Sequence, residues 1–262
     1  MRVGVLQHDP RAHAALRTAL RPEMGRRPVH EFAPSWATLL EWAAGGVIEL
    51  AVVDPWYGTA TGPDLGRLLV LQDRLGPRAI IAYTSALRWA PADRIAPQDL
   101  RIPLLTVGVD DDVGRFRRAM GSAAASTCLL QDAQRLLDGR LAADQVDLAF
   151  AILDPYRAAD DLCEVARSLG VGGRELRRRA TRSRIPAPRV LHRWSRVFLA
   201  VGLHRLGIRN RTTQAACLGY NDATSVNRLF RELLGRPAGT VLGDDEQEAR
   251  AIQSTMDLVQ SA

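Results

Sequence analysis

Short apolar runs alternate with amphipathic segments of helical length over residues 1–120. Four of these runs are rich in β-branched residues and have the length of buried strands. They read RVGVLQ (2–7), VIELAVVD (47–54), RAIIAYTS (78–85) and RIPLLTVGV (101–109). Helical patterns lie between and after them: PRAHAALRTALRP (10–22), LGRLLVLQDRL (65–75) and DDDVGRFRRAMGSAA (110–124). Strands separated by helices favour a parallel sheet covered on both faces, so we predict an α/β domain here.

Only helical patterns follow, from about residue 121 to the C-terminus. Leucines at helical spacing predict a helical linker at 121–142, and those of 129–141 are a candidate homodimer interface. Residues 143–243 make up the predicted second domain, which is all-α. The remaining segment, 244–262, starts with acidic residues, and we expect a short helix or partial disorder there.

Two stretches of the second domain each combine a helix, a glycine turn and a second helix: they span 160–183 and 212–235. One long apolar helical pattern with arginines on its polar side, PRVLHRWSRVFLAVGLHRLG (188–207), runs between them. This order is typical of two helix-turn-helix units joined by one helix. In each stretch the second helix has one apolar face and one polar face.

The polar faces of these second helices carry side chains that hydrogen-bond or bear positive charge. The residues predicted to point outward are Arg174, Arg177, Arg178 and Thr181 in the first stretch and Thr224, Asn227, Arg228 and Arg231 in the second. The residues predicted to point inward are Leu176 and Ala180 in the first stretch and Val226, Leu229, Phe230 and Leu233 in the second.

The positive charge of the chain is concentrated around these stretches. All 35 basic residues are arginine, and the formal net charge is +6. Residues 160–242 hold 16 Arg against 6 Asp and Glu, a net +10, whereas the remainder holds 19 Arg against 23 acids, a net −4. A localised excess of this size is expected of a domain that binds a polyanion.

The second stretch also follows a more specific pattern of alanine, glycine-aromatic, acid, small polar, arginine, phenylalanine and base. The matching residues are Ala216, Gly219, Tyr220, Asp222, Thr224, Arg228, Phe230 and Arg231. This pattern resembles the AraC/XylS-type transcription-regulator domain, over roughly 143–243. The chain departs from that family at Val226, where an aromatic residue is usual, and at Pro237, which falls one residue early. In the first stretch, Gly172–Gly173 replaces a Ser-Pro cap and Ala180 replaces a phenylalanine.

The resemblance implies a sequence-specific transcription regulator whose partner is double-stranded DNA. The major groove admits a helix and presents base edges that Asn, Arg and Thr side chains can read. Arginines also contact phosphates and fix the register, which is the role we predict for Arg231. The predicted base-contacting residues are Thr224, Asn227 and Arg228 in the second unit and Arg174, Arg177 and Arg178 in the first, with Thr181 on the same face.

Two other classes of function are weaker alternatives. A basic region can instead dock an acidic protein, which salt dependence and competition by duplex DNA distinguish. An enzyme is not favoured, because we find no phosphate-binding glycine loop with a lysine, no metal-ligand spacing and no nucleophile with an evident base in the sequence.

Two polar residues end predicted strands of the first domain 30 positions apart: Asp54 and Thr84. This arrangement resembles the receiver domain of two-component response regulators, a flavodoxin-like fold with a parallel sheet. In that family an aspartate at a strand end is phosphorylated beside Mg²⁺, and a threonine or serine responds to the phosphoryl group. The resemblance implies that Asp54 is the phosphoacceptor position and Thr84 the switch hydroxyl.

The chain departs from the receiver pattern at the other site positions. Gln7 and His8 stand at the acidic pair, Asp9 lies one position late, and Thr106 stands near the lysine position. Mg²⁺ prefers carboxylate ligands, and phosphoryl transfer needs its charge neutralised. We therefore predict a receiver-like input domain that is not phosphorylated in the standard Mg²⁺-dependent way. We expect His8, Asp9 and Asp54 to converge at the strand ends, either as a docking surface or pocket for another protein or small-molecule ligand, or as a polar loop without function. The alternative is a phosphorelay response regulator phosphorylated on Asp54.

Nothing else in the sequence points to a cofactor or metal. No run of about 18 apolar residues predicts a membrane span and no signal-peptide pattern opens the chain, so we expect a cytoplasmic protein. The isolated cysteines are expected to be small buried hydrophobes. They are Cys128, Cys163 and Cys217. Three histidines, expected in helices or loops, are interpreted as surface or packing residues: His30, His192 and His204.

Overall fold

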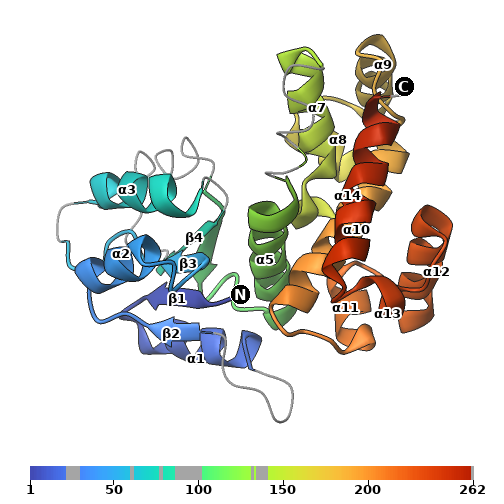
Figure 1. Cartoon of the computed structure of the whole chain (residues 1–262). Helices are drawn as coiled ribbons and strands as arrows, with labels where there is room; N and C mark the ends of the chain where they lie inside the picture. Colours follow the sequence, from blue (N-terminus) through green and yellow to red (C-terminus); the bar gives the residue numbers. More distant parts are fainter. Residues whose placement is uncertain are drawn as a thin grey trace. The chain divides into compact units, whose positions relative to one another are not determined.

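A computed structural model describes residues 1–21, 30–59, 62–76, 79–85, 102–130, 133 and 141–260. The chain divides into two compact units. The N-terminal unit comprises Met1–Thr127 with Arg205–Ile208, and the C-terminal unit comprises Cys128–His204 and Arg209–Ala262. The strands all belong to the first unit, and the second is drawn as helices alone in the described chain (Figure 1). The division after Thr127 falls within the predicted linker at 121–142, and most of the candidate dimer segment 129–141 lies outside the described residues.

The N-terminal unit is built on a five-stranded sheet in the order β2-β1-β3-β4-β5, with every neighbouring pair parallel. This confirms the predicted parallel α/β fold. The strands are β1 (Val3–Leu6), β2 (His30–Phe32), β3 (Leu50–Val53), β4 (Ile80–Ser85) and β5 (Leu104–Val107). We did not predict β2, because this edge strand is only three residues long and contains His and Glu instead of an apolar run.

Helices cover both faces of this sheet (Figure 1). They are α1 (Pro10–Ala19), α2 (Trp36–Ala44), α3 (Leu65–Leu75) and α5 (Val113–Ala125). Helix α1 contacts α5, and α2 contacts α3. Each helix begins after a side chain that accepts a hydrogen bond from the first turn, which satisfies a backbone N–H that has no helical partner. These caps are Asp9, Ser35, Asp64 and Asp112.

The strand register brings the candidate residues of this unit to one edge. Leu6 pairs with Val53, and Thr84 pairs with Thr106. Because the strands are parallel, the residues that follow β1 and β3 lie at the same edge as the end of β4. In this strand order the connections leave β1 and β3 in opposite directions, and such a switch point is where open α/β sheets commonly bind ligands.

Helices make up the described part of the C-terminal unit; the first begins at Ser126, just before the unit boundary, and α10 is the longest. In chain order they are η2 (Ser126–Leu130), α7 (Ala143–Leu153), η3 (Pro155–Arg157), α8 (Leu162–Ser168), α9 (Gly173–Arg182), α10 (Pro188–Arg205), α11 (Arg211–Cys217), α12 (Ala223–Leu234), α13 (Ala238–Val241) and α14 (Asp245–Gln260). Helix α10 supplies much of the core: Leu191, Trp194, Phe198 and Val201 are at most 3% exposed. Their spacing of three and four residues puts them on one helical face.

The C-terminal segment differs from our expectation of a short or partly disordered tail. Residues Asp245–Gln260 form the 16-residue helix α14. Its apolar side chains Ala251, Ile252, Met256 and Val259 are buried, at intervals that recur on one helical face. The prediction gave too much weight to the acidic first turn, which is favourable at a helix N-terminus. In the described part of the chain, no helix combines the length and apolarity that a membrane crossing requires.

Candidate functional site

The helix pairs α8–α9 and α11–α12 are joined by turns of the same geometry. The turns contain Gly170 and Gly219, whose φ angles are +68° and +75°. In each turn the next residue, Val171 or Tyr220, donates its N–H to the carbonyl five residues earlier, at 3.0 and 2.9 Å. This is the Schellman arrangement, in which a left-handed glycine lets the chain satisfy the last helical carbonyls. The two pairs therefore share one backbone design.

The second helices of the pairs begin differently. The Asp222 carboxylate caps α12 by accepting the Ser225 N–H at 2.8 Å. This bond and the one from the Ser225 hydroxyl lower the pKa of Asp222. Helix α9 follows Gly172 and has no side-chain cap. The glycine pair that departs from the AraC/XylS pattern therefore leaves the start of α9 without the side-chain stabilisation that α12 has.

Helix α9 buries one face and exposes its arginines, as predicted. Leu176 and Ala180 are each 1% exposed. Glu175 forms ion pairs with Arg178 at 2.5 Å and with Arg179 at 3.3 Å. All four residues predicted to point outward are exposed: Arg174, Arg177, Arg178 and Thr181. Of these, Arg174 and Arg177 have no ion-pair partner among the described residues, so their guanidinium groups are available for a ligand.

Helix α12 also shows the predicted apolar stripe. Val226, Leu229 and Phe230 are at most 2% exposed, and Leu233 is half-buried. On the other side, the predicted contact residues Thr224, Arg228 and Arg231 are exposed. Three of the four candidates on this helix therefore have the accessibility that a base or phosphate contact requires.

Asn227 is the exception on α12. It is half-buried, and its side-chain oxygen accepts a hydrogen bond from the N–H of Ala238, at 3.2 Å. Ala238 is the first residue of α13, so Asn227 satisfies one of the free N–H groups at the start of that helix. Bidentate recognition of adenine uses both the oxygen and the nitrogen of the amide. The amide oxygen of Asn227 therefore has a structural partner in α13, and its assignment to base contact stays a prediction.

Arg196 links the two helix pairs through α10, a function that we did not predict. Its Nε donates to the carbonyl of Ala158, at 2.8 Å, and a terminal nitrogen donates to the Tyr220 hydroxyl, at 3.1 Å. The guanidinium carbon also lies 4.8 Å from the centre of the Tyr220 ring. Ala158 comes just before α8, whereas Tyr220 lies in the α11–α12 turn, so one side chain holds both pairs. In the sequence, Arg196 is one arginine among several on α10.

The two pairs also meet directly at the second turn. A Cβ atom at Gly219 would lie 3.0 Å from the carbonyl oxygen of Ala159. Nearby, the buried imidazole of His192 lies 3.2 Å from the carbonyl of Arg157. Burial is the main cause that lowers the pKa of His192, with a smaller opposing effect from this hydrogen bond. These contacts fix the start of α8 against α10 and the second turn.

In the N-terminal unit, His8, Thr84 and Asp54 come together at the strand ends. Asp54 is 1% exposed. One carboxylate oxygen accepts hydrogen bonds from the Thr84 hydroxyl at 2.8 Å and from the Trp56 N–H at 3.1 Å. His8 Nδ1 lies 3.1 Å from the other oxygen, and its side chain is 43% exposed. Both oxygens of the candidate phosphoacceptor are therefore engaged, and of the His8–Asp54 pair only His8 is substantially exposed.

Gln7 and Asp9, which follow β1, both bond to nearby backbone groups. The Gln7 amide nitrogen donates to the carbonyl of Tyr83 at 2.7 Å, and its oxygen accepts the N–H groups of His8 and Asp9. The Asp9 carboxylate caps α1 by accepting the Arg11 N–H at 2.8 Å. Among the described contacts, the Asp9 carboxylate bonds to the first turn of α1, and none joins it to Asp54.

Thr106, at the end of β5, belongs to a second group of polar contacts. The Thr106 N–H donates to the Asp110 carboxylate at 2.7 Å, and Asp110 pairs with Arg115 at 2.7 Å. The Tyr83 hydroxyl donates to Asp111, and burial together with this bond raises the pKa of Tyr83. Within the described ranges, no group of three or more His, Cys, Asp or Glu residues is arranged to hold a metal ion. The Asp54 cluster consequently has the chemistry of a satisfied polar network.

The expected burial of Cys163 and the expected helix or loop setting of His30 are wrong, whereas the interpretation of His30 as a packing residue is confirmed. Cys163 is exposed on α8, whereas Cys217 is buried as predicted, and the Cys128 side chain lies outside the described residues. His30 lies in strand β2 and packs edge-on against Phe32, with ring centres 5.6 Å apart. Burial, with a smaller effect of Arg17, lowers the pKa of His30.

The geometry defines a two-unit protein with a parallel α/β unit and a helical unit that carries repeated helix pairs. No protein-family model, curated protein or solved structure matches this chain.

Proposed function

We propose that this protein is a sequence-specific, non-enzymatic transcription regulator. Its C-terminal unit carries two helix-turn-helix units of the AraC/XylS type, α8–α9 and α11–α12. The observation that carries the proposal is the repeated turn: two helix pairs share one hydrogen-bond pattern, and each ends in a helix with exposed arginines. Both pairs lie in the region of net charge +10. Two similar basic helices held by one long helix suit contacts with successive turns of a duplex.

Each second helix is proposed to enter the major groove. In α9, Arg174 and Arg177 are the leading base-contact candidates, because Glu175 engages Arg178. In α12, Thr224 and Arg228 are the candidates, and Arg231 is assigned to phosphate. Arginine reads guanine with two hydrogen bonds, and a threonine can contact a base edge or the thymine methyl group.

Selection of bound sites from random duplexes, with the full chain, tests the proposal. We expect an enriched sequence with two conserved blocks about 10 base pairs apart, one for each helix. Arg177→Gln should relax preference in one block and Arg228→Gln in the other, each by about 1–3 kcal/mol. Enrichment of no sequence would contradict sequence-specific binding.

Salt titration distinguishes this proposal from binding to an acidic protein. Binding to a duplex releases condensed counterions, so the logarithm of the affinity should fall linearly with the logarithm of salt concentration. An acidic protein should be displaced from the chain by unlabelled duplex. Failure of excess duplex to compete with such a protein would favour the alternative.

The N-terminal unit is proposed to be a receiver-like input domain that does not use Mg²⁺-dependent phosphorylation. His8 and Thr84 engage Asp54, so an incoming phosphoryl group must displace His8 without a nearby lysine to neutralise its charge. We expect no acyl phosphate after incubation with acetyl phosphate and Mg²⁺, as measured by intact mass. An adduct of about 80 Da that is absent from the Asp54→Asn variant would instead support the phosphorelay alternative.

A further inference from the structure

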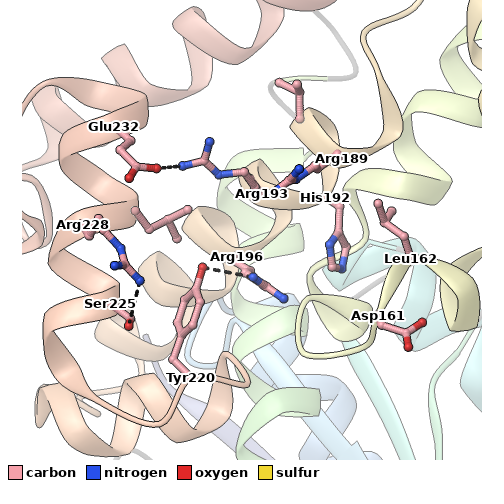
Figure 2. A pocket seen from close by; sticks show the side chains of 12 residues that line it. Asp161, Leu162, Arg189, His192, Arg193, Arg196, Tyr220, Ser225, Arg228 and Glu232 are labelled. Carbon is pink, nitrogen blue, oxygen red and sulfur yellow. Dashed lines mark hydrogen bonds and ion pairs between the residues drawn. The ribbon is translucent and has the colours of Figure 1, made fainter.

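A groove of about 500 Å³ lies beside α12 in the C-terminal unit. Arginines from two helices line it: Arg189, Arg193 and Arg196 come from α10, and Arg228 comes from α12 (Figure 2). Tyr220 and two carboxylates, Glu232 and Asp161, also line it, and Asp161 caps α8 by accepting the Glu164 N–H. We call this feature the arginine groove.

The three arginines of α10 line the same groove because of their spacing. Positions 189, 193 and 196 are four and three residues apart, which places them on one helical face. Arg196 is held by Ala158 and Tyr220, so it fixes the floor of the groove. Arg189 is exposed and has no ion-pair partner in the part of the chain that the structure describes. Its guanidinium group is therefore the one most available to an anion.

The other two guanidinium groups have weak or exchangeable partners. Arg193 pairs with Glu232, and their side chains are 33% and 50% exposed. A terminal nitrogen of Arg228 lies 3.4 Å from the Ser225 hydroxyl (Figure 2). Solvent-exposed ion pairs contribute little net energy, so an anion of higher charge density can compete for Arg193. The groove thus presents several positive groups to one ligand.

Arg228 connects the groove with the exposed face of α12. Ser225, Arg228 and Glu232 line the groove, whereas Thr224 and Arg231 lie on the adjacent part of the same exposed side and are not among its lining residues. A helix in the major groove has a phosphate strand along each of its flanks. The arginine groove lies on one flank of α12, so in this orientation one of the two strands would run beside it.

We propose that the arginine groove binds phosphates of the DNA strand that runs alongside α12. This inference rests on the proposed function, and it assigns a sequence-independent contact to α10, outside both helix-turn-helix units. Arg189 and Arg193 contact the phosphates, Arg196 keeps the groove open against Tyr220, and Glu232 weakens binding by holding Arg193 and repelling the strand.

The test measures affinity of the full chain for a selected duplex and for a random duplex over a range of salt concentrations. Arg189→Gln and Arg193→Gln should each lower the affinity for both duplexes by the same factor. Each should also lower the salt slope by about 1. Glu232→Gln should raise the affinity for both duplexes severalfold, because it releases Arg193 and removes a negative charge. The matched control is Glu246→Gln, which releases Arg250 from a similar exposed ion pair on α14 and should change neither affinity.

The outcomes separate this inference from the function on which it rests. If the wild-type chain binds no duplex, both are overturned. If it binds duplexes but the Arg189, Arg193 and Glu232 variants keep its salt slope and affinity, only the groove assignment fails. A free phosphorylated molecule is the other source of the same chemistry. Stabilisation of the wild-type chain by inorganic pyrophosphate, saturable and abolished by Arg189→Gln, would assign the groove to such a molecule and overturn the DNA assignment.

Discussion

The two candidate sites of this protein use polar residues in opposite ways. At the strand ends of the N-terminal unit, Asp54 is buried and receives hydrogen bonds or an ion-pair contact from Thr84, Trp56 and His8. On α9 of the C-terminal unit, Arg174 and Arg177 are exposed and have no ion-pair partner among the described residues. A group already satisfied by the protein must lose those bonds before it can bind a ligand, whereas an exposed group loses only water. The comparison therefore favours the helices as the binding surface.

The largest expected contrast in unfolding free energy is between removing a buried, hydrogen-bonded side chain, Asp54, and removing an exposed one, Arg177. Asp54→Ala leaves the Thr84 hydroxyl and the Trp56 N–H without their acceptor, so we expect a loss of about 2–4 kcal/mol in unfolding free energy. Arg177→Ala should change the unfolding free energy by less than about 0.5 kcal/mol, because the side chain is exposed. Urea unfolding and duplex binding of both variants measure the contrast.

Asp54→Asn is the control for the first substitution, because it keeps an oxygen acceptor and should cost less than alanine. For the second, Arg177→Ala should weaken duplex binding although its unfolding curve is unchanged. A stable Asp54→Ala variant that binds DNA differently from wild type would contradict the division of roles between the two sites.

Arg196 in the C-terminal unit is, like Asp54, held by several protein groups, whereas Arg193 on the same helix takes part in an exposed ion pair. Arg196→Met tests this difference. Methionine keeps an apolar stem but loses the hydrogen bonds to Ala158 and Tyr220, so we expect a loss of about 2–3 kcal/mol in unfolding free energy. Arg193→Met breaks an exposed ion pair with Glu232, which is worth at most about 1 kcal/mol. Equal losses in urea unfolding for the two variants would show that Arg196 does not link the helix pairs.

The two turn glycines provide a closer comparison within the C-terminal unit. Alanine at Gly170 or at Gly219 has to adopt a left-handed conformation, which costs about 1–2 kcal/mol. At Gly170 the added Cβ meets nothing within 4 Å, whereas at Gly219 it meets the Ala159 carbonyl at 3.0 Å. Gly219→Ala should therefore lower the unfolding free energy more than Gly170→Ala. Indistinguishable urea midpoints would mean that the second turn has room to move away from Ala159.

Periodicity predicted much of this fold because it follows from local spacing. The apolar runs predicted β1, β3, β4 and β5, and the stripe of Val226, Leu229 and Phe230 predicted the buried side of α12. Strand β2 was not predicted, because an edge strand of three residues needs no apolar run. Its pairing with β1 is a tertiary property that no short window contains.

Periodicity could not distinguish the polar residues that hydrogen-bond within the protein from those that stay exposed to a ligand. Arg196 and Arg177 are both arginines on the polar side of a helical pattern, yet only Arg196 meets a carbonyl and a tyrosine from distant segments. Similarly, the spacing of Asp54 and Thr84 correctly indicated a shared edge, but Gln7 and His8 determine what that edge can bind. These distinctions depend on long-range contacts, so the sequence predicts candidate faces better than individual roles.

Asn227 gives the smallest expected effect and the sharpest test of that distinction. Asn227→Ala removes the acceptor for the Ala238 N–H at the start of α13, so we expect a loss of about 1 kcal/mol in unfolding free energy. Its ratio of affinities for selected and random duplexes should remain that of wild type. Thr224→Ala, one turn earlier on the exposed face, should leave stability unchanged and reduce that ratio. If Asn227→Ala instead unfolds like wild type and loses only the affinity for the selected duplex, its amide reads a base despite the contact with α13.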